Sequence, residues 1–292
     1  MRFRSPAYTV FSILNYTFIG ILSICCVLPL IHIFAVSLSS KAAATANIVN
    51  FWPVGFTLDA YMQTLGNDKF LQALMIGIER TVLGTAISMT IVVMAAYSLS
   101  KSNDRFKGRN MYSWFFIFMM LFNGGLIPTY LVVSNTGLYD TIWALVIPNA
   151  VNVWNIILML NFFRNLPAEL EEAALIDGAG HLRTVFSIYI WVSMPAIATL
   201  SLFTMVIHWN SWFDGIIYLT SSDKYPLSSF LQTIVVQDNF AQTGVDPEKL
   251  EQISNRTVKA SQIFIGALPI LIVYPFLQKY FVKGIVIGSV KG

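Results

Sequence analysis

The chain has 292 residues, of which 56% are hydrophobic and only 11% are charged. Soluble domains carry about 25% charged residues, so this chain has too few to cover a surface that faces water. Its net charge of +3, without a run of basic residues, argues against a nucleic-acid-binding protein. Composition therefore predicts an integral membrane protein in a lipid bilayer.

Six segments are long and apolar enough to cross a bilayer, which needs about 20 residues per helix. The first contains no Asp, Glu, Lys or Arg and exceeds the apolar part of a signal peptide, about 7–15 residues. We expect it to be a retained span, with a cleaved signal peptide as the alternative. Further on, turn residues beside Asp140 divide a long apolar stretch in two. The predicted spans, in a single transmembrane domain of residues 1–292, are 10–38, 71–100, 111–133, 141–163, 184–219 and 260–282.

Lysine and arginine residues gather on the face that carries both chain ends, most clearly in the short loop 101–109. Such residues are enriched in cytoplasmic loops, so we expect both termini in the cytoplasm. The long segments 39–70 and 220–259 then lie outside. Long loops of this kind are often functional, and these two are candidates for docking a partner.

The inner segment 166–180 is predicted to form a short helix. Pro167 suits the first helical position, the acidic residues that follow suit the positive end of the helix dipole, and Gly178 suits a left-handed stop. An isolated helix needs about 12–15 residues to persist in water. This segment is shorter, so we expect a partner to pack on it.

This segment and several others resemble the permease subunits of binding-protein-dependent ABC importers. The cytoplasmic EAA signature of that family matches Glu172, Ala173, Ala174, Asp177, Gly178, Ala179, Phe186, Ile188 and Pro195. Residues 51–57, 95–101, 124–130 and 208–210 are similar to carbohydrate permeases of the maltose type, in the oligo- and polysaccharide branch that includes alginate importers. The resemblance implies an all-α membrane protein with six transmembrane helices, a cytoplasmic coupling helix and the type I ABC importer permease fold.

The resemblance also implies a function and partners. The chain would form half of a translocation pore for an oligo- or polysaccharide, alginate being one candidate, in the bacterial cytoplasmic (inner) membrane. ATP-driven alternating access would need a second permease, two ATPase subunits and an extracytoplasmic solute-binding protein. Glu172 is the residue expected to pair with a basic ATPase side chain. The implied ATPase-coupling residues are Glu171, Glu172, Ala173, Ala174, Asp177, Gly178 and Ala179.

Motifs for catalysis are missing from the sequence. It contains no G-x-x-x-x-G-K-[ST] phosphate loop, no Cys/His cluster with metal-ligand spacing and no paired nucleophile and base. We therefore expect that this chain is not an enzyme and holds no cofactor or metal. ATP and Mg would be bound by the partner ATPase.

Polar residues inside the predicted spans are candidates for the substrate path. Asn149, Asn152 and Asn155 recur every third residue and would form one stripe on a helix. The stripe predicts either hydrogen bonds between helices or a polar wall of the translocation path.

A second polar group lies in the outer half of the fifth span. Trp209, Asn210, Trp212 and Asp214 could stack on sugar rings and bind hydroxyls, or the tryptophans could belong to an interfacial belt. Arg80 could attract a uronate carboxylate, or it could extend toward water or pair with an acid on a neighbouring helix.

Other classes of function remain open. An importer of the same family could carry a non-sugar solute such as an amino acid or ion. A secondary transporter without an ATPase would need ionisable residues near the middle of the membrane, where the spans have almost none beyond Glu79 and Arg80. A purely structural membrane subunit is the third possibility.

Overall fold

A computed structural model describes residues 6–241 and 256–289. The elements in these ranges are helices, and no strand occurs among them. The chain divides into two compact units, one from residues 1–71 and 233–268 and the other from residues 72–232 and 269–292. The single transmembrane domain stays a prediction. Residues 242–255, within the predicted outer segment 220–259, lie outside the described residues.

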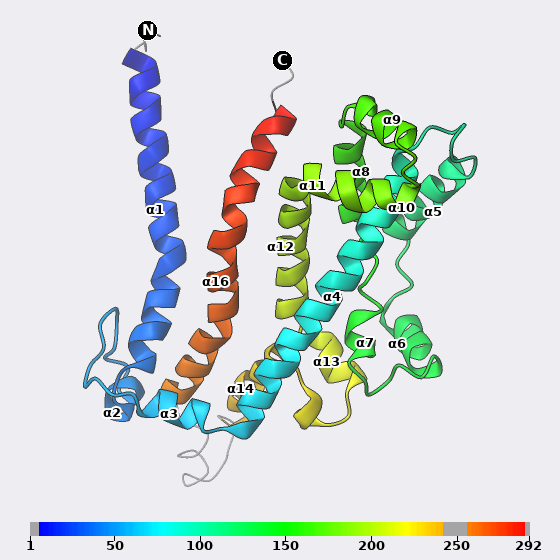
Figure 1. Cartoon of the computed structure of the whole chain (residues 1–292). Coiled ribbons are helices and arrows are strands. Elements are labelled where there is room, and N and C mark those ends of the chain that lie inside the picture. Colours follow the sequence, from blue (N-terminus) through cyan, green and yellow to red (C-terminus); the bar gives the residue numbers. More distant parts are fainter. Residues whose placement is uncertain (1–5, 242–255, 290–292) are drawn as a thin grey trace. The chain divides into compact units, whose positions relative to one another are not determined.

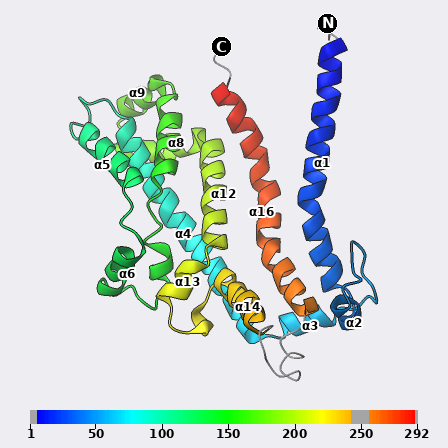
Figure 2. The ribbon, with the colours of Figure 1, turned by 180° about the vertical axis from the view of Figure 1, so that it is seen from behind.

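The first unit begins with the long helix α1 (Pro6–Ser37), followed by α2 (Lys41–Thr45) and α3 (Asp59–Leu65). Figure 2 shows α2 and α3 beside the last turns of α1. The side chain of Ser40 caps α2, as is typical of serine before a helix. Only the last turn of α1 is buried, and most of its other apolar side chains are exposed, as expected of a helix in lipid. The small core consists of Ala35, Val36, Ala43, Ala44, Val49 and Ala260.

Most of the second unit packs around α4 (Asp68–Ser100). Near the end of α4 lie α8 (Val153–Arg164) and α9 (Ala168–Ile176), and toward its start lies α13 (Phe213–Tyr218) (Figure 1). The main core lies between α4, α8 and the segment after α9. Its buried residues are Met89, Val92, Val93, Ala96, Tyr97, Leu99, Ile156, Met159, Phe163, Val185, Tyr189 and Leu200.

Three helices of the described chain are long and apolar enough to cross a membrane as continuous rods. They are α1, α4 and the start of α16 (Arg256–Ser289). These three match the predicted spans 10–38, 71–100 and 260–282.

Two more predicted spans are bent pairs of helices. α5 (Arg109–Leu121) and α6 (Leu126–Asn135) meet at 117°. Gly125 lies in this break with φ +86°, a conformation that glycine adopts without the usual steric cost. With each bent pair counted as one span, the described residues provide up to five spans by length and composition.

The second bent pair replaces the predicted span 184–219. The segment His181–Val192 meets α12 (Met194–Asn210) at 86°. The segment consists of α10 (His181–Thr184), the π-helix η1 (Val185–Tyr189) and α11 (Ile190–Val192). Pro195 follows the break, and because proline has no N–H it cannot continue the helix that precedes it.

The predicted span 141–163 is wrong as one continuous helix. Its residues form the short α7 (Trp143–Val146), an irregular stretch and α8. Pro148 disfavours helical backbone just before it, and Asn152 caps a new helix. The 12 residues of α8 span about 18 Å at about 1.5 Å per residue, less than a bilayer core of about 30 Å.

Close packing of α4 against α12 predicts a strong effect of a single methyl group. A Cβ at Gly84 would lie 2.6 Å from ring atoms of His208, a buried side chain that cannot move aside freely. We expect Gly84→Ala to destabilise the protein by about 1–3 kcal/mol, as overpacking does, measured as a lower melting temperature in detergent.

Gly20 provides the matched control, because it also lies within a long helix but a Cβ there meets nothing within 4 Å. Alanine is about 1 kcal/mol better than glycine in a helix, so Gly20→Ala should leave the melting temperature unchanged or higher. Equal melting temperatures of the two variants would contradict the packing argument.

Candidate coupling segment and substrate path

Helix α9 occupies the predicted coupling segment 166–180, and local signals mark both of its ends. Pro167 was expected to be the first helical residue, but its ψ of 130° places it just before the helix. At the other end Gly178 has φ +77°, the predicted left-handed stop. The Gly178 N–H donates to the Leu175 carbonyl at 3.0 Å and the Ala179 N–H donates to the Ala174 carbonyl at 2.9 Å. These two bonds satisfy carbonyls that the helix end would otherwise leave free.

One face of α9 is held by a buried ion pair. The Nζ of Lys101, the residue after α4, donates to Oε2 of Glu171 at 2.7 Å, and the Tyr189 hydroxyl donates to the same oxygen at 2.9 Å. The Lys101 ammonium also lies 3.7 Å from the ring centroid of Tyr97 and 4.6 Å from that of Tyr189, within cation–π range. We call Lys101, Glu171, Tyr97 and Tyr189 the lysine clamp. It joins α9 to α4 and η1.

The surroundings of Glu171 favour its charged form. Burial raises the pKa of this carboxyl, but the hydrogen bonds from Lys101 and Tyr189 and the positive charges of Lys101 and Arg105 outweigh burial, so the pKa lies below its ordinary value. The side chains of Lys101 and Glu171 are only 8% and 9% exposed. Solvent therefore screens this pair little, unlike the more exposed Arg105, whose Nη1 lies 3.4 Å from Oε1 of Glu171.

The two faces of α9 differ in exposure. Glu171 and Ala174 are buried, so Glu171 fixes α9 from within instead of offering its carboxylate to a partner. Glu172, Ala173, Asp177 and Gly178 are exposed, and Ala179 is half-buried. The exposed face also carries Glu169 and Ile176, the latter 85% exposed. Among the described residues, no ion pair occupies this acidic face with its apolar tip. A basic partner could therefore contact it.

The three asparagines do not form one stripe, because the helix that would carry them begins only at Val153. Asn149 lies in the irregular stretch before it, and Asn152 caps it by accepting from the Asn155 N–H at 3.1 Å. Asn155 is buried and donates to Thr204 Oγ1 on α12 at 3.1 Å. Of the two explanations left open by sequence, hydrogen bonding between helices is the one that Asn155 shows.

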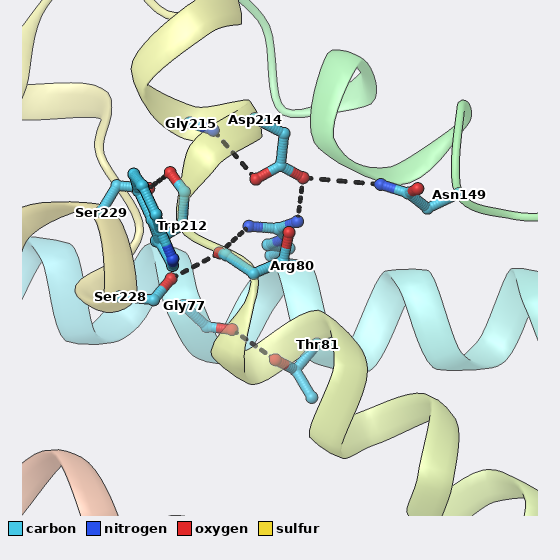
Figure 3. Close-up of polar contacts among 10 residues, drawn as sticks. Gly77, Arg80, Thr81, Asn149, Trp212, Asp214, Gly215, Ser228 and Ser229 are labelled. Atoms are coloured by element: carbon cyan, nitrogen blue, oxygen red, sulfur yellow. Dashed lines mark hydrogen bonds and ion pairs between the residues drawn. The ribbon is translucent and has the colours of Figure 1, made fainter. Parts of the chain in front are cut away.

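Arg80, Asp214 and Asn149 come together at the start of α13 (Figure 3). The Arg80 side chain is fully buried. Its Nη2 donates to Asp214 Oδ2 and its Nη1 donates to the Ser211 carbonyl at 2.7 Å. The Asn149 side chain lies 3.5 Å from the same Asp214 oxygen. Of the three alternatives given for Arg80, the structure shows the pairing with an acid on a neighbouring element.

The other predicted path residues lie at the end of α12 and in the gap between α12 and α13. Asn210 donates its side-chain N–H to the Val206 carbonyl at 2.9 Å. Trp212 is 39% exposed. Trp209 lines an open apolar pocket, beside Ile78 and Pro269 among others. Contact of these tryptophans with sugar stays a prediction.

Comparison with known proteins agrees with this architecture. The family of binding-protein-dependent transport system inner membrane components matches residues 88–287. The chain belongs to this family. The polygalacturonan/rhamnogalacturonan transport system permease protein YtcP of Bacillus subtilis (strain 168) is 40% identical, over 97% of this chain and 99% of the relative. Protein LplC of the same organism is 41% identical, over 99% and 97%.

A solved structure supports the same placement. A bacterial ABC transporter involved in the import of the acidic polysaccharide alginate matches with a TM-score of 0.85 and 35% sequence identity, over 96% of this permease and 100% of that chain. The predicted family and the type I permease fold are therefore confirmed, and the permease is a multi-pass component of the inner membrane.

Three contacts of the permease could not be predicted from sequence. Lys101 and Glu171 are 70 positions apart and Arg80 and Asp214 are 134 positions apart. In the third, Lys224 pairs with Asp140; this hydrogen bond and one from the Thr220 N–H at 3.0 Å lower the pKa of Asp140 to about 2. The charges were visible in the sequence, but no local pattern indicates which partner each one meets.

Proposed function

We propose that this permease is one of two permeases of an ABC importer that carries oligosaccharides of an acidic polysaccharide across the bacterial cytoplasmic membrane. The observation that carries the proposal is the near full-length likeness to two transport proteins of this kind. One is named for polygalacturonan and rhamnogalacturonan and the other for alginate. A non-sugar solute and transport without an ATPase are not favoured.

The proposed assembly contains this chain, a second permease, two ATPase subunits and an extracytoplasmic solute-binding protein. Membership of the family supports these classes of partner. ATP and Mg would be bound and hydrolysed on the ATPase subunits, with no cofactor or catalysis on this chain. Both termini would lie in the cytoplasm, together with α9.

The proposed coupling contact is the exposed acidic face of α9. ATP binding would draw the ATPase subunits together, move α9 and open the pore outward by alternating access. The exposed residues Glu172, Ala173, Asp177 and Gly178 would contact the ATPase. Glu171, Ala174 and Ala179 would support that surface from behind, a division that follows from their burial.

The substrate and the need for this chain can be tested together. A strain that lacks only this permease should lose ATP-dependent uptake of labelled oligogalacturonides, and plasmid-borne permease should restore it. Maltodextrins of equal length serve as the uncharged control. Uptake of oligogalacturonides that survives the deletion would contradict the proposal.

Reversing one exposed charge on α9 should weaken binding of the ATPase. Glu172→Lys replaces attraction by repulsion at the proposed contact, so we expect less ATPase to co-purify with the variant. Because exposed ion pairs contribute about 0–1 kcal/mol, the loss should be partial. Salt screens exposed charges, so the loss relative to wild type should shrink as the salt concentration rises. Asp59→Lys makes the same charge change at an exposed residue of the predicted outer segment 39–70, on the opposite side of the membrane in the proposed topology, and serves as the matched control. Unchanged stoichiometry for Glu172→Lys would count against the contact.

A further inference from the structure

The gap between α12 and α13 leaves backbone carbonyls outside regular helix. α12 ends at Asn210, and Ser211 has extended backbone with φ −69° and ψ 119°. Inside a membrane protein such irregular backbone persists only where other groups satisfy it. Arg80 Nη1 donates to the Ser211 carbonyl at 2.7 Å, and the Ser228 hydroxyl donates to the same oxygen at 2.6 Å. The Ser229 hydroxyl donates to the Trp212 carbonyl at 2.7 Å. Side chains of α4 and α14 (Leu227–Ala241) thus hold the gap in place.

The space around these contacts is tightly filled. A Cβ at Gly215 would lie 2.2 Å from the Ser229 hydroxyl and 3.2 Å from Cδ of Pro226. Close packing of this kind leaves the gap little freedom to adopt a second geometry. Figure 3 shows the Arg80 guanidinium pointing toward the Asp214 carboxylate, which the Asn149 side chain also approaches.

The charge of Arg80 is neutralised inside the protein. The guanidinium is completely buried, and the Asp214 side chain that neutralises it is 11% exposed. Asn149 approaches the same oxygen of Asp214 from the other side. A substrate carboxylate could reach Arg80 only by displacing Asp214, which would leave that carboxylate without its partner at a cost.

Two tryptophans that are predicted to contact the substrate lie next to this gap. Trp209 lies in the last turn of α12, and Trp212 lies directly before α13. The direction of the Trp212 ring therefore depends on the geometry that Arg80 imposes on Ser211 and Asp214. A shift of about 1 Å in a positioning group can cost a large factor in function.

We propose that Arg80 is a positioning residue of the substrate path. Its guanidinium fixes the α12–α13 gap and thereby aims Trp212, and it does not bind the carboxylates of the substrate. The proposal rests on the proposed function, because the path is taken to carry acidic saccharides.

The test uses the assembled importer in proteoliposomes, with oligogalacturonides and their methyl-esterified, uncharged forms as transported probes. Arg80→Gln and Asp214→Asn should each lower uptake of both probes about tenfold or more, as mispositioning predicts. The two variants change the net charge in opposite directions. If both lose uptake, the cause is therefore the broken ion pair and not the change in charge. Arg80→Gln/Asp214→Asn should recover part of the uptake, because it leaves no buried charge unpaired. A loss in Arg80→Gln confined to the charged probe would overturn the proposal.

A second measurement does not depend on transport. With Cys25 and Cys26 replaced by serine, Phe213→Cys places a thiol on the exposed first residue of α13, where its reaction rate with a charged maleimide reports local opening. Arg80→Gln should raise this rate about threefold or more, and an unchanged rate would overturn the positioning role. If the wild-type importer carries neither probe, the proposed substrate is wrong, while the labelling rate still decides the role of Arg80.

A milder variant covers the case in which Arg80→Gln does not assemble. Ser228→Ala removes one of the two side-chain donors to the Ser211 carbonyl without changing a charge. Uptake of both probes should fall by the same factor, less than for Asp214→Asn, and the labelling rate should rise. Wild-type uptake and labelling in Ser228→Ala would contradict the proposal.

Discussion

Lys101→Met should abolish most transport, although the chain still inserts into the membrane. The variant removes one partner of a buried ion pair and leaves the Glu171 carboxylate with the Tyr189 hydroxyl and the half-exposed Arg105, 3.4 Å away, which does not replace the buried cation. Breaking a buried pair from one side costs about 3–5 kcal/mol. The lysine clamp is also what joins α9 to α4, so movement of α9 would no longer reach the membrane helices. We expect a lower melting temperature of the complex, and ATPase activity that the loaded binding protein no longer stimulates.

Arg105→Met is the matched control for this prediction. It removes a positive charge from the same carboxylate, but the Arg105 side chain is 48% exposed, and exposed pairs contribute about 0–1 kcal/mol. Uptake and stimulation should therefore stay close to wild type. Equal losses in Lys101→Met and Arg105→Met would contradict the importance of burial.

A double variant separates stability from coupling. Lys101→Met/Glu171→Leu replaces the whole pair by apolar side chains, a change that is often neutral or stabilising. The melting temperature should return toward wild type while transport remains low. Full recovery of transport would limit the lysine clamp to a role in stability.

The parts of the fold that follow from local sequence were predictable. The apolar stretches at α1, α4 and α16 identify long helices without any knowledge of their neighbours, since length and composition suffice. Gly178 likewise identifies the end of α9, because the left-handed stop depends on a single residue type.

The parts that depend on distant residues were not predictable. The asparagine stripe assumed one helix through residues 141–163, but the chain ends α7 before Pro148 and starts α8 after Asn152. Arg80 looked like a candidate carboxylate ligand until its partner Asp214, 134 positions away, was placed beside it. Pairings over such separations depend on how the helices pack, which no local pattern records.

Gly178→Asp should leave the permease folded and inserted but collapse both transport and substrate-stimulated ATPase activity. At φ +77° a residue other than glycine pays about 1–2 kcal/mol, and aspartate is among the residues that tolerate this conformation best. A Cβ at this position meets nothing within 4 Å, so the chain itself can accept the side chain. The added carboxylate beside Asp177 would instead disturb the surface proposed to contact the ATPase.

Gly137→Asp is the matched control that distinguishes backbone strain from loss of the ATPase contact. Gly137 has φ +73°, and a Cβ there also meets nothing within 4 Å, but it lies in the turn between α6 and α7, away from α9. Gly137→Asp carries the same local cost and adds the same charge, so both variants should have similar melting temperatures and membrane levels. Uptake and stimulated ATPase activity should fall only in Gly178→Asp. If both variants lose transport equally, strain alone explains the effect; if neither does, α9 is not the surface through which the ATPase acts.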